Sequence, residues 1–186
     1  RDNRQRFASL CKGRSVLDAC CYTGGFAIQA KRLGDAGEVT GVELDEAAMQ
    51  MARENARLNN VKAQFVQADA FAYLRDMYRN GKKYEAIVLD PPKLIRTREE
   101  TSEAKRKYFD LNRLALQLAA PDAVLLTCSC SGMLSQDEFT QMVFTAAHDV
   151  GRSVQLLVRS GAAPDHPIGG QCPESEYLKT LLLRVE

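Results

Sequence analysis

Residues 14–26 have the sequence Arg-Ser-Val-Leu-Asp-Ala-Cys-Cys-Tyr-Thr-Gly-Gly-Phe. A strand is predicted over 14–19, and a helix is predicted from Gly25 to about Leu33. Between them, Gly24 and Gly25 allow backbone dihedrals that other residues avoid, and they let the backbone pass close to a ligand. A strand that leads through a glycine turn into a helix is typical of an α/β fold.

The same alternation continues along the chain. Further strands are predicted at 38–44, 63–68, 84–89, 123–128, 153–158 and 179–184, and further helices at 46–59, 69–79, 103–118 and 136–150. This order predicts a seven-stranded, mostly parallel sheet with helices on both faces. Because the last two strands would form a hairpin, the last strand is predicted to be antiparallel.

The bulk composition describes an ordinary globular domain. The 186 residues are 45% hydrophobic and 26% charged, and the net charge is only +1, so no global electrostatic footprint points to nucleic acid. No apolar run is long enough to span a membrane, and no signal peptide is recognised. The six cysteines show neither zinc-ligand spacing nor a disulfide framework, so we expect no metal and a reducing cytoplasm.

Three acidic residues lie at the ends of the first three predicted strands, where α/β proteins bind ligands. Glu43 is placed to accept hydrogen bonds from ribose hydroxyls, Asp69 to reach an adenine edge, and Asp18 to hold a cationic amino group. The turn matches neither the dinucleotide pattern G-x-G-x-x-G nor a P-loop, which disfavours a pyrophosphate. These acids therefore indicate a nucleoside with a charged tail, S-adenosylmethionine. The alternative is that Asp45 and Asp69 only cap helices, and that the glycines form a plain tight turn.

Asp90-Pro91-Pro92-Lys93 follows the apolar strand 84–89. Two prolines fix the backbone and donate no amide hydrogen bonds, so nearby carbonyls are free to accept from an exocyclic amine while Asp90 bonds a ring nitrogen. The alternative is a strand that is simply stopped by proline. The next segment is rich in charges of both signs and is either a solvated loop or a cover for a nucleic-acid backbone; its basic residues are Lys93, Arg96, Arg98, Lys105, Arg106 and Lys107.

Several short motifs occur together in one known family. They are Tyr22-Thr23-Gly24-Gly25-Phe26, Asp90-Pro91-Pro92-Lys93, Asp110-Leu111-Asn112, Thr127-Cys128-Ser129-Cys130-Ser131-Gly132, and Ala163-Pro164-Asp165-His166-Pro167 with Tyr177-Leu178-Lys179. Over almost its whole length, the chain resembles the catalytic domain of the large-subunit (23S-type) ribosomal RNA cytosine-C5 methyltransferases. The resemblance implies a Rossmann-like class I methyltransferase fold that uses S-adenosylmethionine.

The resemblance and the strand-end positions together assign the site residues. The implied catalytic residues are Cys130 and Asp90. The implied cofactor-binding residues are Asp18, Tyr22, Thr23, Gly24, Gly25, Phe26, Glu43, Leu44, Asp69, Ala70 and Asp90. The implied substrate-binding residues are Pro91, Pro92, Lys93 and His166.

The chemistry explains why a cysteine is needed. Cytosine C5 is too weak a nucleophile to attack a sulfonium methyl, but a thiolate that adds at C6 makes C5 enamine-like. Cys128 and Cys130 are two apart and would share a face of a strand. Cys130 lies past the predicted strand end and within the Ser-Cys-Ser-Gly motif, so we expect it to be the nucleophile and Cys128 to be a structural neighbour. The alternative is that both are packing residues.

Two features depart from the family pattern. Cys20 and Cys21 stand where apolar or aromatic residues are expected, and we interpret them as packing residues near the cofactor. Family members also carry an N-terminal RNA-binding domain of the PUA type, which this chain lacks. We therefore expect residues 1–13 to be a lead-in from an upstream region, residues 14–186 to be the methyltransferase domain, and ribosomal RNA to bind mainly through the missing domain. A homodimer is a further expectation.

Two other functions stay open on the sequence. One is an RNA guanine N-methyltransferase, which needs no thiol because a nitrogen lone pair attacks directly. In such enzymes an aromatic residue tends to follow Asp/Asn-Pro-Pro, whereas Lys93 follows here. The other is a cofactor-binding module without activity of its own.

Overall fold

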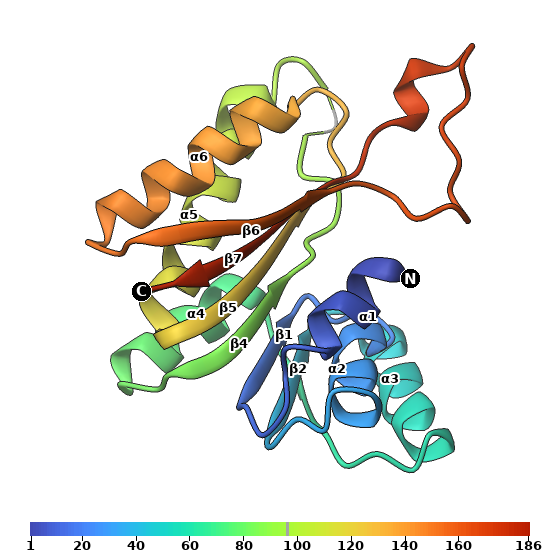
Figure 1. The fold of residues 1–186 in the computed structure, drawn as a ribbon, viewed down its shortest axis with the longest axis vertical. Helices are drawn as coiled ribbons and strands as arrows, with labels where there is room; N and C mark the ends of the chain where they lie inside the picture. The colour runs from blue at the N-terminus through green and yellow to red at the C-terminus, as the bar shows by residue number, and fades with distance from the viewer. Residues whose placement is uncertain (96) are drawn as a thin grey trace.

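The computed structural model describes residues 1–95 and 97–186, so Arg96 of the charged segment lies outside the described residues. A seven-stranded sheet runs through the molecule in the order β3-β2-β1-β4-β5-β7-β6 (Figure 1). The strands are β1 (Val16–Ala19), β2 (Val39–Glu43), β3 (Gln64–Gln67), β4 (Tyr84–Leu89), β5 (Ala119–Ser129), β6 (Val154–Ser160) and β7 (Lys179–Val185). The helices are α1 (Asp2–Ala8), α2 (Gly25–Arg32), α3 (Glu46–Leu58), α4 (Ala70–Arg79), α5 (Thr101–Leu118) and α6 (Gln136–Asp149), with a 3₁₀ turn at Pro173–Ser175.

The predicted sheet topology is confirmed. Strands β1 to β5 pair in parallel, and β7 is antiparallel to both β5 and β6. Helices α1 to α3 cover one face and α4 to α6 cover the other, which gives three layers (Figure 1). Strand β4 lies between β1 and β5 and is buried on both faces at Ala86–Leu89, as its unbroken apolar run predicts.

Most element bounds fall within two residues of the prediction, but β5 is longer. It begins at Ala119 rather than at residue 123. Pro121 and Asp122 interrupt the apolar pattern there, and Asp122 has a positive φ of 60°. The pairing register with β4 also shifts between Tyr84 and Ala86. The strand continues through this irregularity. The residue pattern alone does not predict that continuation.

Helix α1 is the element that the sequence did not predict. It consists of seven residues, of which only Phe7 and Ala8 are buried, so it carries almost no amphipathic signal. Phe7 packs edge-on against Phe26 of α2, with the ring centroids 6.0 Å apart. Residues 1–13 therefore begin with a helix that is packed against the first βα unit.

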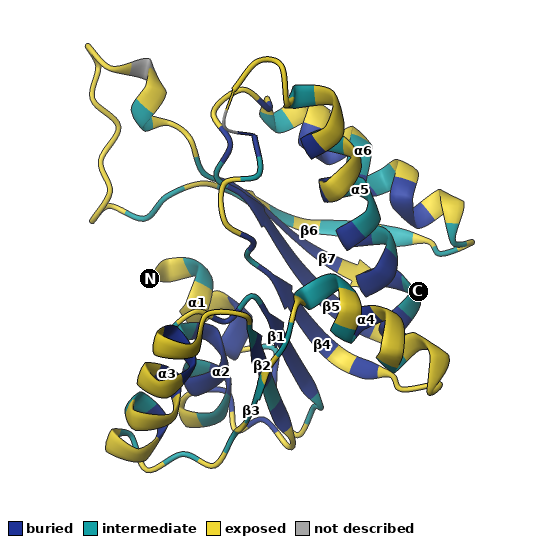
Figure 2. Cartoon of the chain, turned by 180° about the vertical axis from the view of Figure 1, so that it is seen from behind, coloured by how far each residue is buried: buried dark blue, intermediate teal, exposed yellow. Residues whose placement is uncertain are grey.

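Figure 2 shows a buried sheet between the helices, and a largely exposed connection between β6 and β7 that extends beyond the sheet. Within the described residues, none of the helices combines the length and the apolar character that crossing a membrane requires.

The contact between α1 and α2 depends on Gly34, just after α2. A Cβ at this position would overlap the backbone oxygen of Ala8 and would stand 2.6 Å from that of Ala30. We therefore expect Gly34→Ala to lower the free energy of unfolding by about 1–3 kcal/mol, measured by urea denaturation. Gly170→Ala is the control, since a Cβ there meets nothing within 4 Å. Equal stability of the two variants would contradict this packing.

Candidate active site

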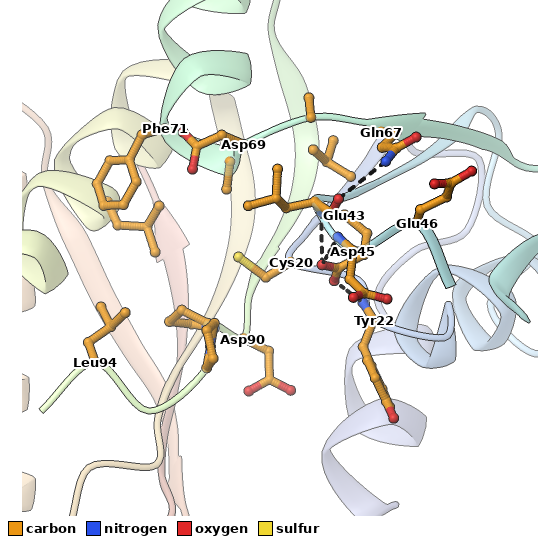
Figure 3. Close-up of a pocket in the computed structure, with 17 residues that line it drawn as sticks. Cys20, Tyr22, Glu43, Asp45, Glu46, Gln67, Asp69, Phe71, Asp90 and Leu94 are labelled. Carbon is orange, nitrogen blue, oxygen red and sulfur yellow. Dashed lines mark hydrogen bonds between the residues drawn. The ribbon is translucent and has the colours of Figure 1, made fainter. Parts of the chain in front are cut away.

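Four acidic residues meet at the carboxyl edge of the parallel sheet. Asp18 lies in β1, Glu43 ends β2, Asp69 follows β3 and Asp90 follows β4. Three of them border a cavity of about 830 Å³, and Figure 3 shows Glu43, Asp69 and Asp90 arranged around it. Its walls are formed by Cys20, Tyr22, Val42, Glu43, Leu44, Asp45, Glu46, Gln67, Ala68, Asp69, Ala70, Phe71, Asp90, Pro91, Pro92, Leu94 and Leu111.

The Glu43 carboxylate is held by backbone amides. Its Oε1 accepts from Leu44 at 2.8 Å and from Asp45 at 3.0 Å, and its Oε2 accepts from Tyr22 at 2.8 Å (Figure 3). A carboxylate has about four acceptor positions, so these bonds leave room for about one more donor. The bond from Tyr22 also fastens the glycine turn to the end of β2.

Asp45 and Asp69 each have a capping role. The side chain of Asp45 accepts from the amide of Ala48 at the start of α3, and that of Asp69 accepts from Ala72 at the start of α4. The interpretation of both as helix caps is confirmed. Both also line the large cavity, so capping fixes a carboxylate at the cavity wall rather than removing it from the site.

Two residues of the glycine turn, Cys20 and Tyr22, line the large cavity. Tyr22 is 66% exposed and lines the cavity, whereas Phe26 is buried. The carbonyl of Thr23 accepts a hydrogen bond from Asn55. Gly24 precedes α2 with a positive φ of 81°, and a Cβ there would meet Ala52, Ile28 and Phe65, each at 3.3 Å. Space and backbone conformation therefore both favour glycine at this position.

Asp18 is almost completely buried, with 1% of its surface exposed. Its Oδ2 accepts from the amide of Ala27 at 2.9 Å, which satisfies one of the free amides at the N-terminus of α2. Its Oδ1 is buried and has no hydrogen-bond partner among the described residues. Burial raises the pKa of Asp18 to about 7. A cationic group placed at Oδ1 would satisfy this oxygen and favour the ionised form.

Asp90 borders two cavities. Besides the large cavity it lines a smaller one of about 240 Å³, together with Arg1, Asn3, Arg4, Phe26, Cys128, Ala162, Ala163, Asp165, His166, Tyr177 and Leu178. Burial raises the pKa of Asp90, and the nearby Arg4 guanidinium opposes that rise. Pro91, which follows, is buried, whereas Pro92 and Lys93 are exposed. Asp90 is thus the residue that the two cavities share, while Pro91 and Pro92 line the large one.

The two cysteines of β5 differ in position. Cys128 is inside the strand, 3% exposed, with its Sγ 3.6 Å from Thr180 Oγ1. Cys130 is the first residue after the strand, is half-buried, and has its Sγ 3.9 Å from the carbonyl oxygen of Pro91. The strand end therefore separates them as the sequence predicts. Of the two, Cys128 is the one that lines the smaller cavity.

The charges near Cys130 act in opposite directions. Burial raises the pKa of the Cys130 thiol, and the Asp90 carboxylate raises it further. Lys179 and Lys93 lower it. Lys179 is itself buried, and its Nζ donates to the carbonyl oxygens of Ser131 and Tyr177, which holds a positive charge beside the loop that carries Cys130. No role was predicted for Lys179 from the sequence, because the residues around it do not indicate that its side chain is buried.

Burial and neighbouring carboxylates disfavour the thiolate forms of the two cysteines of the glycine turn. Cys20 lines the large cavity, but burial raises its pKa to about 12, with the anionic Glu43 as the next cause. Cys21 is buried and packs tightly against Gly41. A Cβ at position 41 would be only 3.0 Å from the Cys21 sulfur. Both positions agree with the interpretation as packing residues near the cavity.

His166 reaches the smaller cavity from the exposed connection between β6 and β7. Its Nδ1 is 3.6 Å from Asp165, and Asp165 forms an ion pair with Arg1 at 3.2 Å. The chain start and the β6–β7 connection therefore meet above Asp90. Among residues 1–95 and 97–186, no group of three or more His, Cys, Asp or Glu side chains is arranged to hold a metal ion.

Known proteins resemble this chain in sequence and in fold. A family model described as a methyltransferase domain matches residues 10–181. Ribosomal RNA large subunit methyltransferase I of Aeromonas hydrophila is 46% identical over 187 residues, which cover 99% of this chain and 47% of that protein. The chain thus spans about half the length of the curated relatives it matches.

Two crystal structures share the fold at low sequence identity. SMU.776, a candidate methyltransferase complexed with SAH, aligns with a TM-score of 0.85 at 20% identity, over 98% of this chain and 48% of that one. NSun6 from Pyrococcus horikoshii, with SFG, aligns with a TM-score of 0.71 at 18% identity, over 98% of this chain and 50% of that one.

The opposing charges around Cys130 predict how it reacts. Asp90→Asn removes the anion that raises the Cys130 pKa, so the thiolate fraction at pH 7.5 increases and alkylation by iodoacetamide becomes several-fold faster. In both proteins the rate rises with pH. Peptide mass spectrometry follows Cys130 separately from the buried Cys11, whose rate serves as the internal control. Slower alkylation of Cys130 in Asp90→Asn would contradict the assignment of Asp90 as its charged neighbour.

Proposed function

This chain belongs to the methyltransferase-domain family and is a relative of the ribosomal RNA large subunit methyltransferase I proteins, and on that premise we propose that it methylates C5 of a cytosine in large-subunit ribosomal RNA with S-adenosylmethionine as donor. The proposal depends most on one observation: Asp90 lines both a cavity sized for a nucleoside cofactor and a smaller one that is lined by Cys128, two residues before Cys130. A methyl group would pass from one space to the other at this residue.

The large cavity suits S-adenosylmethionine by charge. Its lining includes five acidic residues and no basic one: Glu43, Asp45, Glu46, Asp69 and Asp90. Such a lining repels phosphates and favours a ligand with a sulfonium and an ammonium group. The remaining acceptor position of Glu43 would receive a ribose hydroxyl, Asp69 would face the adenine, and the buried Asp18 behind the glycine turn would attract the ammonium through its charge. When bound, the cofactor supplies an electrophilic methyl group.

The smaller cavity suits a target base that has left its stack. The Watson–Crick edge of cytosine has acceptors at O2 and N3 and a donor at N4, so N3 and N4 together call for one donor and one acceptor from the protein. Because its pKa is raised, Asp90 is suited to donate a proton at N3. The carbonyl oxygen of Pro91, 3.9 Å from Cys130 Sγ, would accept from N4. This pairing would fix the ring so that the cysteine sulfur can approach C6 from the ring face.

The proposed reaction starts with the thiolate of Cys130. Its sulfur adds to C6, and the negative charge that develops on the ring is stabilised by Asp90 at N3. C5 would then receive the methyl group that the cofactor supplies, with S-adenosylhomocysteine as the leaving group. A base removes the C5 proton, the bond between Sγ and C6 breaks, and the aromatic ring and the thiolate are restored. Lys179 and Lys93 support the thiolate through their positive charge.

Ribosomal RNA is proposed as the partner because of the named relatives and because Lys93 is exposed next to Pro92, which lines the large cavity. Two other lysines of the charged segment are already paired: Lys105 with Glu138 at 2.7 Å and Lys107 with Glu103 at 2.7 Å. They therefore contribute less to phosphate binding than a count of basic residues suggests. The upstream RNA-binding domain, the homodimer and the cytoplasmic location stay predictions.

Trapping on fluorinated RNA tests the covalent step. A large-subunit rRNA transcript containing 5-fluorocytosine should form a stable adduct with the chain in the presence of S-adenosylmethionine, because fluorine cannot leave C5 as a proton does. Denaturing gel electrophoresis detects the adduct. We expect it in the unmodified chain and in Cys128→Ala, and at least a hundredfold less of it in Cys130→Ala, where no thiol can add to C6.

The matched cysteine variants make the outcome decisive. An adduct that persists in Cys130→Ala and disappears in Cys128→Ala would assign the nucleophile to the residue that lines the smaller cavity. Undiminished methyl transfer to RNA by Cys130→Ala would instead favour direct attack by a guanine nitrogen. S-Adenosylmethionine binding without transfer, by protein that also binds the RNA, would leave only a cofactor-binding module.

A further inference from the structure

Arg4 of α1 occupies a position that no motif in the sequence marks. Three atoms of its guanidinium group lie 2.6–2.9 Å from where a Cβ on Gly25 would stand. The group is also 5.7 Å from the centroid of the Phe26 ring. Glycine at position 25 therefore leaves room for the arginine, and helix α1 delivers a positive charge directly to the start of α2, within the glycine turn.

The surroundings of Arg4 are acidic. Its charge lowers the pKa of both Asp18 and Asp90, against the burial that raises them. In the part of the chain that the structure describes, no hydrogen bond or ion pair joins its guanidinium to another residue, although an arginine has five N–H donors. It is solvent-exposed and lines the smaller cavity, which meets the large one at Asp90.

The proposed cofactor carries a negatively charged group that needs a cationic partner. Its methionyl tail carries an α-carboxylate as well as an ammonium group. The large cavity is lined by five acidic residues and no basic one, so its side chains offer the carboxylate no cationic partner. With the adenosine placed at Glu43 and Asp69, the tail extends toward Asp18 and Asp90, and Arg4 is the cation beside both.

We propose that Arg4 binds the α-carboxylate of the S-adenosylmethionine tail beside Asp90, where the two cavities meet, and leaves the Cys128 side of the smaller cavity to the target base, a subsite that rests on the proposed function. Arginine suits this role because its planar fork can hold both oxygens of a carboxylate at once. The positive N-terminus of α2 acts in the same direction. Helix α1 is then part of the cofactor site rather than only a lead-in to the domain.

Calorimetry with three ligands isolates the carboxylate. S-Adenosylmethionine has the whole tail, decarboxylated S-adenosylmethionine lacks only the carboxylate, and 5′-methylthioadenosine lacks both tail charges. We expect Arg4→Ala to weaken binding of the first by about ten- to a hundredfold, as for a lost charge-assisted pair, and to leave the other two within about twofold. Arg4→Lys should recover part of the loss. Arg6→Ala, on the same helix with its guanidinium bonded to Asn3, is the control and should change nothing.

Each other outcome has a distinct meaning. Equal weakening of all three ligands by Arg4→Ala, with a lowered melting temperature, would overturn the proposal and make Arg4 a packing residue for α1. Unchanged S-adenosylmethionine binding with weakened ribosomal RNA binding would also overturn it, in favour of a phosphate contact. Absence of S-adenosylmethionine binding by the unmodified chain would refute the proposed function itself, which separates that failure from a failure at Arg4.

Discussion

Four carboxylates stand at the ends of four neighbouring parallel strands, and the most deeply buried, Asp18, has its pKa raised by burial and by the charges of Asp90 and Glu43. The structure satisfies three of them with backbone amides: Asp18 through Ala27, Glu43 through its three amide donors, and Asp69 through the start of α4. These bonds hold the acids in place before any ligand arrives. The glycine turn and the starts of α2 and α4 are therefore arranged around a cluster of negative charge, which a cationic ligand would complete.

Asp90 is the fourth carboxylate, and its surroundings differ. It follows directly after the buried β4, borders both cavities, and has a raised pKa opposed by Arg4. A carboxyl group in that state can donate as well as accept, which suits a position between a cationic cofactor and a base with an acceptor nitrogen. The same carboxylate raises the pKa of Cys130. Protonation of Asp90 on substrate binding would thus both hold the base and ease formation of the thiolate.

Pattern and strand-end rules predicted the sheet, its antiparallel strand and the meeting of Asp18, Glu43, Asp69 and Asp90, since parallel strands bring their carboxyl ends to one edge. They could not predict α1, whose polar residues and two buried side chains give no periodic signal, so Arg4 was missed. The shape of the cavities could not be predicted from the sequence either. It depends on how the chain start and the β6–β7 connection, far apart in sequence, pack over the sheet edge.

The most direct test of this account is the identity of the methylated nucleoside. Ribosomal RNA incubated with the chain and methyl-labelled S-adenosylmethionine is digested to nucleosides and separated by chromatography with mass detection. The account predicts that the label appears in 5-methylcytidine and that Cys130→Ala abolishes it. Label in an N-methylguanosine, or 5-methylcytidine formed equally well by Cys130→Ala, would contradict it.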